Sequence, residues 1–267
     1  HEREEKMEEK GFPRNYPMKG KRFLEICKEF LDRIEEGQAE NFKKAGQLIG
    51  DKIMEGGIVH VVGTGGHACL PAYDMFYRAG ALVPINYIIP IGALYGAGGA
   101  THGMRMERTP EYMKQVIDYY RVGNGDVAIV FNNIGVNAAT IDAALACKEK
   151  GATVIGVAGL VWQEDIPEDH HTRHPSRKNL KDIVDLFIDD YNPVGDSVIE
   201  LEGFDRAIAP ISTVSDGYIV RRIEIESIKY MVEKGFKPPV WVSANTVGGD
   251  KANRKYQDDY FYKIKLL

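Results

Sequence analysis

One glycine-rich turn in the chain ends in a histidine and reads Gly63-Thr64-Gly65-Gly66-His67. It follows a short apolar run at residues 57–62 and precedes a helical pattern. A β-branched run, a glycine turn and a helix, in that order, are typical of the first unit of a parallel α/β sheet. Ligands of such folds bind beyond the carboxyl ends of the strands, where glycines let backbone N–H groups approach an oxygen-rich ligand. We therefore expect this turn to be a ligand loop.

A second polar loop follows a later apolar run and reads Asn132-Asn133-Ile134-Gly135-Val136-Asn137. It caps another helical pattern, so it has the same place in its strand–loop–helix unit as the first loop. Ser212 and Thr213 begin the long helical pattern at residues 212–234, where their hydroxyls and the free N–H groups of a helix start could bind an anion. A simple helix cap is an equally good interpretation of either residue.

Two cofactor interpretations of these residues lack the partners that they need. The spacing Gly63-x-Gly65-x-x-Ala68 satisfies a dinucleotide fingerprint, but that motif calls for an acid about 20 residues further on. Residues 88–91 read Ile-Ile-Pro-Ile instead. The histidines at 170, 171 and 174 are irregularly spaced and have no Cys pair, so we expect no metal and no other cofactor. Glycines needed only for a tight turn remain an alternative for the first loop.

The pattern of apolar residues predicts the elements that hold these loops. Helical spacing over 23–34 and again over 42–53, with Gly37 between the runs, predicts an N-terminal helical hairpin. Strand patterns, separated mostly by helical ones, follow at 58–62, 82–89, 127–131, 153–158 and 184–188. This alternation predicts right-handed crossovers and a three-layer α/β/α sandwich with a parallel sheet. The glycine-dense segment at 92–103, which holds His102, is expected to be an irregular, functional or mobile loop.

Length and composition set the domain organisation. The chain has 267 residues, 44% hydrophobic and 27% charged, which is enough to bury one large core. Residues 1–20 are charged and broken by glycine and proline, so we expect a flexible N-terminal arm followed by a single domain at 21–267. A formal net charge of −5 argues against a nucleic-acid partner.

The chain also lacks the signals of a membrane or secreted protein. No stretch approaches the roughly 18 apolar residues of a membrane span, and the N-terminus is charged where a signal peptide needs an apolar core. Cys27, Cys69 and Cys147 are far apart and show no Cys-x-x-Cys spacing, which fits free thiols in a reducing compartment. We expect a cytoplasmic protein with no membrane partner.

Several separated blocks of the chain match one known pattern in the right order. They are Phe76-Tyr77-Arg78-Ala79-Gly80, Arg173-His174-Pro175-Ser176, Gly195-Asp196-Ser197, Glu202-Gly203, Ser212-Thr213 and Pro238-Pro239-Val240-Trp241-Val242-Ser243-Ala244-Asn245. Over residues 23–255 the chain resembles the sugar isomerase (SIS) domain family, in a branch related to phosphoheptose isomerase and N-acetylmuramic acid 6-phosphate etherase. The resemblance implies a five-stranded parallel sheet of the flavodoxin-like type and a homodimer or homotetramer. It also implies a site for a small-molecule sugar or sugar phosphate at the strand ends, formed partly across subunits.

The chemistry implied by this resemblance is aldose–ketose isomerisation by proton abstraction through an enediol-type intermediate. Such a reaction needs a base near the C1–C2 protons and polar groups that stabilise the developing oxyanion. His67 is the best single candidate, because an imidazole at a strand end exchanges protons near neutral pH. Asp74 and Glu107 are alternative bases, for which an exposed helix acid is an equally good interpretation. His174 is a further catalytic candidate within one of the matching blocks.

The expected substrate-binding residues come from both loops, the glycine-dense segment and the late helix start. They are Gly63, Thr64, Gly65, Gly66, His102, Asn132, Asn133, Gly135, Asn137, Ser212 and Thr213. Compared with the branch, both loops lack hydroxyls that hold phosphate, and Ile134 and Val136 cannot donate side-chain hydrogen bonds. An atypical or non-phosphorylated sugar is therefore expected. A non-catalytic sugar-binding sensor and a lyase or etherase with the same carbon-acid chemistry remain as alternatives.

Overall fold

The computed structural model describes residues 19–267, so the arm predicted at 1–20 lies outside the described residues except for its last two positions. The main sheet contains β1 (Val59–Gly63), β2 (Ile85–Ile88), β3 (Val127–Phe131), β4 (Thr153–Ala158) and β5 (Leu186–Asp189). A separate antiparallel ribbon contains β6 (Ser197–Ile199) and β7 (Ile208–Pro210). The longer helices are α2 (Phe23–Met54), α5 (Ala100–Glu107), α6 (Tyr112–Tyr120), α7 (Ala138–Glu149), α9 (Ser212–Glu233) and α10 (Gly249–Tyr260). Short turns of helix are α3 (Cys69–Asp74), η1 (Ile91–Ala93), α4 (Tyr95–Gly98), α8 (Leu160–Asp165) and η2 (Leu180–Asp182).

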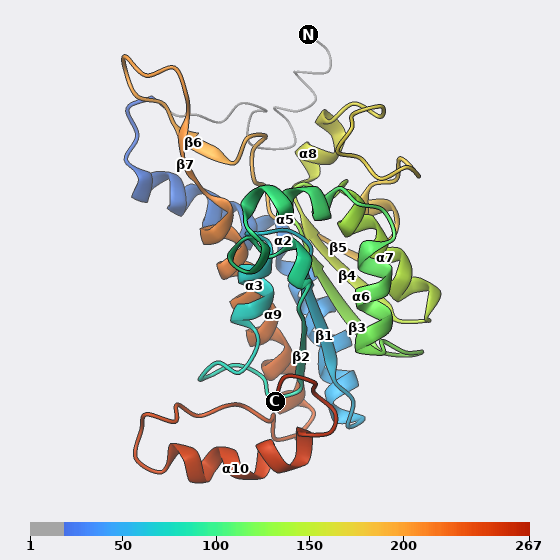
Figure 1. Ribbon diagram of the computed structural model, residues 1–267. Helices are drawn as coiled ribbons and strands as arrows, with labels where there is room; N and C mark the ends of the chain where they lie inside the picture. The colour runs from blue at the N-terminus through green and yellow to red at the C-terminus, as the bar shows by residue number, and fades with distance from the viewer. Residues whose placement is uncertain (1–18) are drawn as a thin grey trace.

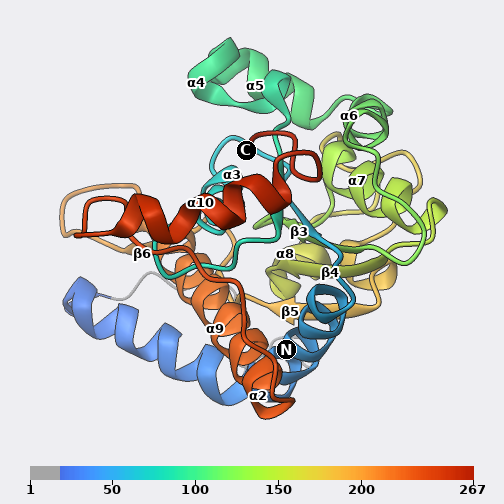
Figure 2. The ribbon, with the colours of Figure 1, turned by 90° about the horizontal axis from the view of Figure 1, so that it is seen from below.

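The main sheet is parallel throughout, with the strand order β2-β1-β3-β4-β5. Alternate residues of the central strand β3 enter different cores. Its odd-numbered positions 127, 129 and 131 pack with α2 and α9, whereas positions 128 and 130 pack with α6 and α7. Since successive strand side chains point to opposite faces, helices cover both sides of the sheet (Figures 1 and 2). The predicted three-layer α/β/α sandwich with a five-stranded parallel sheet is confirmed.

The predicted N-terminal helical hairpin is wrong, because α2 is one continuous helix of 32 residues. Gly37 does not end a helix. A Cβ at this position would lie 2.2 Å from the hydroxyl oxygen of Tyr191, so the glycine lets α2 pass close to the end of β5. Gly46 does the same toward α9, since a Cβ there would lie 2.6 Å from the backbone carbonyl carbon of Glu226. Both glycines are packing contacts between close elements rather than breaks.

The glycine-dense segment at 92–103 is mostly helical, which differs from the irregular loop that we expect from its sequence. It forms part of η1, then α4 and the start of α5, and Gly99 separates the two helices with a φ of 89°. Helix α5 ends at Glu107 near the carboxyl ends of the strands (Figure 1). The segment therefore places the Glu107 side chain at the edge of the sheet where parallel α/β folds in general bind ligands.

The chain after α9 returns along the edge strand β2. Val240 forms an antiparallel bridge with Leu82, and the side chain of Asn253 in α10 bonds to the backbone N–H and C=O of Val242 at 3.0 and 2.7 Å. The three cysteines are free and buried. Among residues 19–267 we find no helix with the length and apolar character needed to cross a membrane.

Candidate functional site

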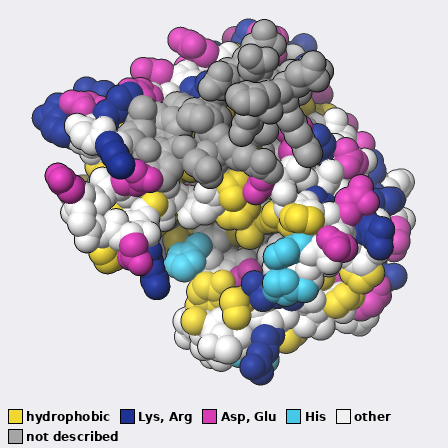
Figure 3. Space-filling model, turned by 90° about the horizontal axis from the view of Figure 1, so that it is seen from above, with side chains coloured by type: hydrophobic (Ala, Val, Ile, Leu, Met, Phe, Trp, Pro, Cys, Tyr) yellow, Lys and Arg dark blue, Asp and Glu magenta, His cyan; other side chains and the backbone are white. Residues whose placement is uncertain are grey.

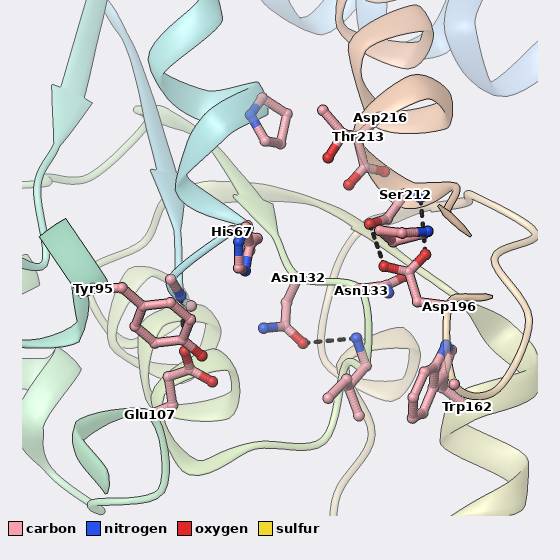
Figure 4. A pocket seen from close by; sticks show the side chains of 17 residues that line it. His67, Tyr95, Glu107, Asn132, Asn133, Trp162, Asp196, Ser212, Thr213 and Asp216 are labelled. Carbon is pink, nitrogen blue, oxygen red and sulfur yellow. Dashed lines mark hydrogen bonds between the residues drawn. The ribbon is translucent and has the colours of Figure 1, made fainter. Parts of the chain in front are cut away.

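A cavity of about 380 Å³ opens at the carboxyl ends of the strands, between the loops after β1 and β3 and the start of α9. Figure 3 shows a hollow in this face of the molecule, and Figure 4 shows the side chains around the cavity. The cavity is lined by Gly65, Gly66, His67, Ala68, Pro71, Tyr95, Glu107, Asn132, Asn133, Ile134, Trp162, Gly195, Asp196, Pro210, Ser212, Thr213 and Asp216. The fold thus brings both predicted loops and the predicted helix start to one cavity.

The loop after β1 is fixed by contacts that leave no room for larger side chains. A Cβ on Gly63 would lie 2.0 Å from the backbone oxygen of the residue before α3, and one on Gly66 would lie 2.3 Å from the Tyr95 ring. Thr64 is fully buried, and its hydroxyl lies 2.7 Å from that of Thr140 in α7. Thr64 therefore supports the loop from below and does not line the cavity.

Glu107 reaches the cavity from the last residue of α5 and is 9% exposed. Its Oε1 accepts a hydrogen bond of 2.7 Å from the backbone N–H of Gly66. Burial raises the pKa of the Glu107 carboxyl, and the Gly66 N–H, the Tyr95 hydroxyl and the charges of Arg108 and His67 oppose this effect in part. A raised pKa makes a cavity carboxyl a stronger base once it is ionised, which suits general acid–base chemistry.

His67 and Tyr95 lie on the same side of the cavity as Glu107 (Figure 4). The centroids of the two rings are 5.4 Å apart and the rings meet edge to face. Burial and the nearby Glu107 carboxyl raise the pKa of Tyr95 to about 12, so its hydroxyl stays protonated and available as a donor. A carboxyl, an imidazole and a phenol therefore converge on one end of the cavity.

Asn132 shapes the second loop. Its side-chain oxygen accepts hydrogen bonds of 2.9 and 2.7 Å from the backbone N–H groups of Ile134 and Gly135. Gly135 has a φ of 72°, and a Cβ there would lie 2.8 Å from the carboxamide carbon of Gln163, so a larger residue does not fit this turn. Because the oxygen of Asn132 is engaged, its amide N–H groups are what it offers to a ligand (Figure 4).

The start of α9, predicted as an anion site, already holds a carboxylate from the chain itself. Oδ1 of Asp196 accepts hydrogen bonds from the N–H groups of Ile211 and Ser212 at 3.1 and 2.9 Å. Its Oδ2 accepts a bond of 2.7 Å from the Ser212 hydroxyl (Figure 4). Ser212 and Thr213 line the cavity as predicted. The donors of Ser212 that could hold a phosphate are satisfied by Asp196 instead.

Two further carboxyl groups lie behind this helix start. Asp216 lines the cavity and is 6% exposed, and Asp190 follows β5 and is fully buried. Burial raises the pKa of both groups, and neighbouring carboxylates raise it further, so ionisation of one disfavours ionisation of the other. Among the residues that the structure describes, Oδ1 of Asp216 and Oδ2 of Asp190 have no hydrogen-bond partner.

Asp74, the other predicted carboxyl base, does not line this cavity. It is the last residue of α3, pairs with Arg78, and its Oδ2 accepts a hydrogen bond of 2.6 Å from Arg221 of α9. His102 is an exposed residue of α5 and is also absent from the wall. Glu107 is therefore the predicted carboxyl that the structure brings to His67.

His174 and Asn137 fasten a neighbouring segment instead of lining the cavity. Nε2 of His174 lies 3.0 Å from Oδ1 of Asp142 in α7. Asn137 precedes α7, and its backbone forms a bridge with Arg173. Within residues 19–267, no group of three or more His, Cys, Asp or Glu side chains is arranged to hold a metal ion.

Three polar residues of the wall are absent from the predicted set. Asp196 stands in a block that matches the SIS pattern. Asp216 follows Ser212 by four positions, so helical spacing places Asp216 and Ser212 on one face of the helix. The sequence therefore held a signal for Asp196 and for Asp216. Tyr95 carried none, because its position depends on α4 and α5 forming where the glycines predict a loop.

The fold and the cavity define a class of protein: a parallel α/β domain with a cavity at the strand ends, on whose wall a buried carboxyl and a histidine both lie. The model of the SIS domain family matches residues 22–159. The chain belongs to this family.

The chain is also similar over most of its length to proteins of the UPF0309 group. The UPF0309 protein lin2794 of Listeria innocua is 34% identical over 245 residues, which are 92% of this chain and 97% of that protein. The UPF0309 protein TTE0306 of Caldanaerobacter subterraneus is 32% identical over 248 residues, 92% of this chain and 98% of that protein. Among solved structures, phosphoheptose isomerase GmhA from Neisseria gonorrhoeae has a TM-score of 0.49 at 14% identity, over 76% of this chain and 92% of that one.

Proposed function

We propose that this protein is a sugar or sugar-phosphate isomerase that works by proton abstraction through an enediol-type intermediate. The observation that carries the proposal is the pair of Glu107 and His67, a buried carboxyl and an imidazole on one side of the cavity. Membership of the SIS family supports a sugar as the ligand. The cavity volume of about 380 Å³ suits a molecule of that size.

Each wall group has a step that fits its chemistry. Glu107 removes the proton from C2 of the aldose and returns it to C1, while His67 moves the hydroxyl proton from O2 to O1. The N–H groups of Asn132 and the hydroxyl of Tyr95 donate to the oxygen on which negative charge develops. The atoms balance within the substrate, so the reaction needs no co-reactant.

The test of this proposal is turnover of a panel of free aldoses, ketoses and their phosphates by the full chain in D₂O, followed by NMR. We expect the ketose to form from one aldose of the panel, with deuterium incorporated at the carbon that gains the proton. No turnover, no carbon-bound exchange and no binding across the panel would contradict the proposal.

Replacement of Glu107 tests the assignment of the base. Glu107→Gln keeps the volume of the side chain but cannot accept a proton, so we expect turnover to fall by about 10²–10⁴. In the wild type, turnover should fall as the pH falls through the raised pKa of Glu107, so the acid limb of the profile should lie above the ordinary value of 4.5. Glu111→Gln makes the same change at an exposed position and should leave both the turnover rate and its pH profile unchanged. A comparable loss from Asp74→Asn, with Glu107→Gln active, would move the base to Asp74.

The panel also separates the alternatives. Binding without turnover, unaltered by Glu107→Gln, would favour a sugar-binding sensor. A product with a new double bond and a released group would favour a lyase or etherase. The proposal includes a homodimer or homotetramer that acts in cytoplasmic carbohydrate metabolism, and native mass measurement of the full chain tests the oligomeric state.

A further inference from the structure

The titratable groups on the wall of the cavity are carboxyl groups, apart from one histidine and one tyrosine. Glu107, Asp196 and Asp216 line it, and no Lys or Arg belongs to the wall among the described residues. Arg108 follows Glu107 in the chain, but its side chain points to His171, with 3.4 Å between Nη1 and Nε2. A phosphate dianion in this cavity would meet carboxyl groups where phosphate sites provide cationic side chains.

Buried polar atoms without partners are found on the same wall. Oδ1 of Asp216, Oδ1 of Asn133 and Nε1 of Trp162 have no hydrogen-bond partner within residues 19–267. All three residues line the cavity, and Asp216 is 6% exposed. Asn133 and Trp162 are neighbours through Gly159, whose N–H bonds to the Asn133 carbonyl at 3.0 Å and whose Cβ would lie 2.8 Å from Trp162. Each of these residues therefore has a buried polar atom beside the cavity that the described chain leaves unpaired, two of them acceptors and one a donor.

This set of atoms matches a protonated amine on a polyhydroxyl ligand. An ammonium group has three N–H donors and no acceptor. Asp216 and Asn133 hold unpaired acceptors beside the cavity, and the Asp196 carboxylate on its wall keeps an acceptor site beyond its three bonds to the start of α9.

We infer that the ligand of this cavity is an amino sugar without phosphate, whose protonated amine lies against Asp196, Asp216 and Asn133. The inference rests on the proposed function, because it names the substrate class of the same site. A neutral sugar would leave these acceptors without a cation. A sugar phosphate would place its negative group against a wall that has no Lys or Arg among the described residues.

The protonation of Asp216 supports the same ligand. Burial raises the pKa of Asp216, and Asp196 and Asp190 face it with further carboxyl groups. Burial and the neighbouring carboxyl groups therefore favour the protonated form of Asp216 in the free protein. An ammonium group beside it favours the carboxylate, so binding of an amine releases a proton, whereas binding of a neutral sugar does not.

The experiment is calorimetric binding to the full chain at pH 7. The probes are glucosamine, galactosamine and mannosamine, with their N-acetyl derivatives, the parent sugars and the parent 6-phosphates. We expect at least one amine to bind about tenfold or more tightly than its parent and its N-acetyl derivative, since bonds to charged groups are the stronger ones. The 6-phosphates should bind more weakly than the parents. Tighter binding of a 6-phosphate, or equal binding of amine and parent, would overturn the inference, as would the absence of binding by every amine.

Two further measurements assign the preference to the wall. Asp216→Asn should reduce the ratio of amine to parent affinity to near one. Glu224 is a buried carboxyl on the same helix that pairs with Arg221 outside the cavity. Glu224→Gln should therefore leave the ratio unchanged. If Asp216→Asn does not fold, wild-type titrations in two buffers of different ionisation enthalpy decide, because the inference requires proton release with the amine alone.

The outcomes separate this inference from the proposed function. Turnover of a phosphorylated sugar, with no binding of amines, would overturn the amino-sugar assignment and leave an isomerase. Amines that bind with the expected preference but show no carbon-bound exchange would support the amino-sugar assignment and contradict the isomerase.

Discussion

At the scale of single residues, Gly66 holds two wall groups in place. Its N–H binds Glu107 at 2.7 Å, and a Cβ would lie 2.3 Å from the ring of Tyr95. In Gly66→Ala the ring or the loop must move, which we expect to lower the free energy of unfolding by about 1–3 kcal/mol. Because the same shift displaces Glu107, sugar affinity and turnover should fall as well. Denaturant unfolding and binding titrations measure the two effects separately.

Gly96→Ala is the matched control for this prediction. Gly96 lies in α4, a Cβ there would meet no atom within 4 Å, and the position does not require a positive φ. Alanine there should leave binding unchanged and change stability by no more than about 1 kcal/mol, in the stabilising direction. Equal stability and affinity of Gly66→Ala and Gly96→Ala would contradict the arrangement of Gly66, Tyr95 and Glu107.

The sequence predicts the site loops well, because it shows where strands end. His67, Asn132 and Ser212 all line the cavity, as their positions after apolar runs or at a helix start suggest. It does not distinguish Glu107 from Asp74, since each is an acid beyond a glycine-rich turn. The two acids differ in burial and in their partners. Asp74 forms ion pairs with Arg78 and with Arg221 of α9. Such partners come from residues far apart in sequence.

At the scale of elements, the contact between α2 and α9 explains why a glycine within a helical pattern need not end it. Gly46 lies where α9 approaches, with 2.6 Å between a Cβ position and the backbone of Glu226. On propensity alone, Gly46→Ala should stabilise α2 by about 1 kcal/mol. We expect the clash to outweigh this gain, so that the free energy of unfolding falls by about 1–3 kcal/mol. Chemical denaturation of the two proteins measures the difference.

Gly217→Ala provides the comparison within the partner helix. Gly217 is an interior residue of α9 with no atom within 4 Å of a Cβ position. Alanine should raise the free energy of unfolding by about 0.5–1 kcal/mol there. A gain of that size at Gly46 too would mean that α2 and α9 are not in close contact. Periodicity alone cannot separate these two glycines. It also cannot show that Gly37 lies inside one helix, which is why it predicts a hairpin where the structure has α2.

At the scale of the whole molecule, ionisable groups make stability depend on pH in two opposite ways. The hydrogen bonds from Arg222 lower the pKa of Glu35, so the stability that this group contributes is lost as the pH falls through the lowered value. Burial raises the pKa of Glu224 from 4.5 to about 7, although Arg221 opposes this shift. The folded protein therefore binds more protons at Glu224 than the unfolded chain between these two values, and stability falls as the pH rises through them. Asp190 and Asp216 act in the same direction as Glu224.

Glu224→Gln tests this dependence, because a neutral amide does not titrate. A shift from 4.5 to about 7, at about 1.4 kcal/mol per pKa unit, corresponds to roughly 3 kcal/mol of stability lost by the wild type across that pH range. We expect the free energy of unfolding to fall less steeply with pH in Glu224→Gln than in the wild type, by chemical denaturation at a series of pH values. Glu233→Gln changes an exposed acid of the same helix and should keep the wild-type slope. Identical slopes in all three proteins would mean that Glu224 ionises in the folded protein as readily as in the unfolded chain, so that its burial in α9 does not control its charge.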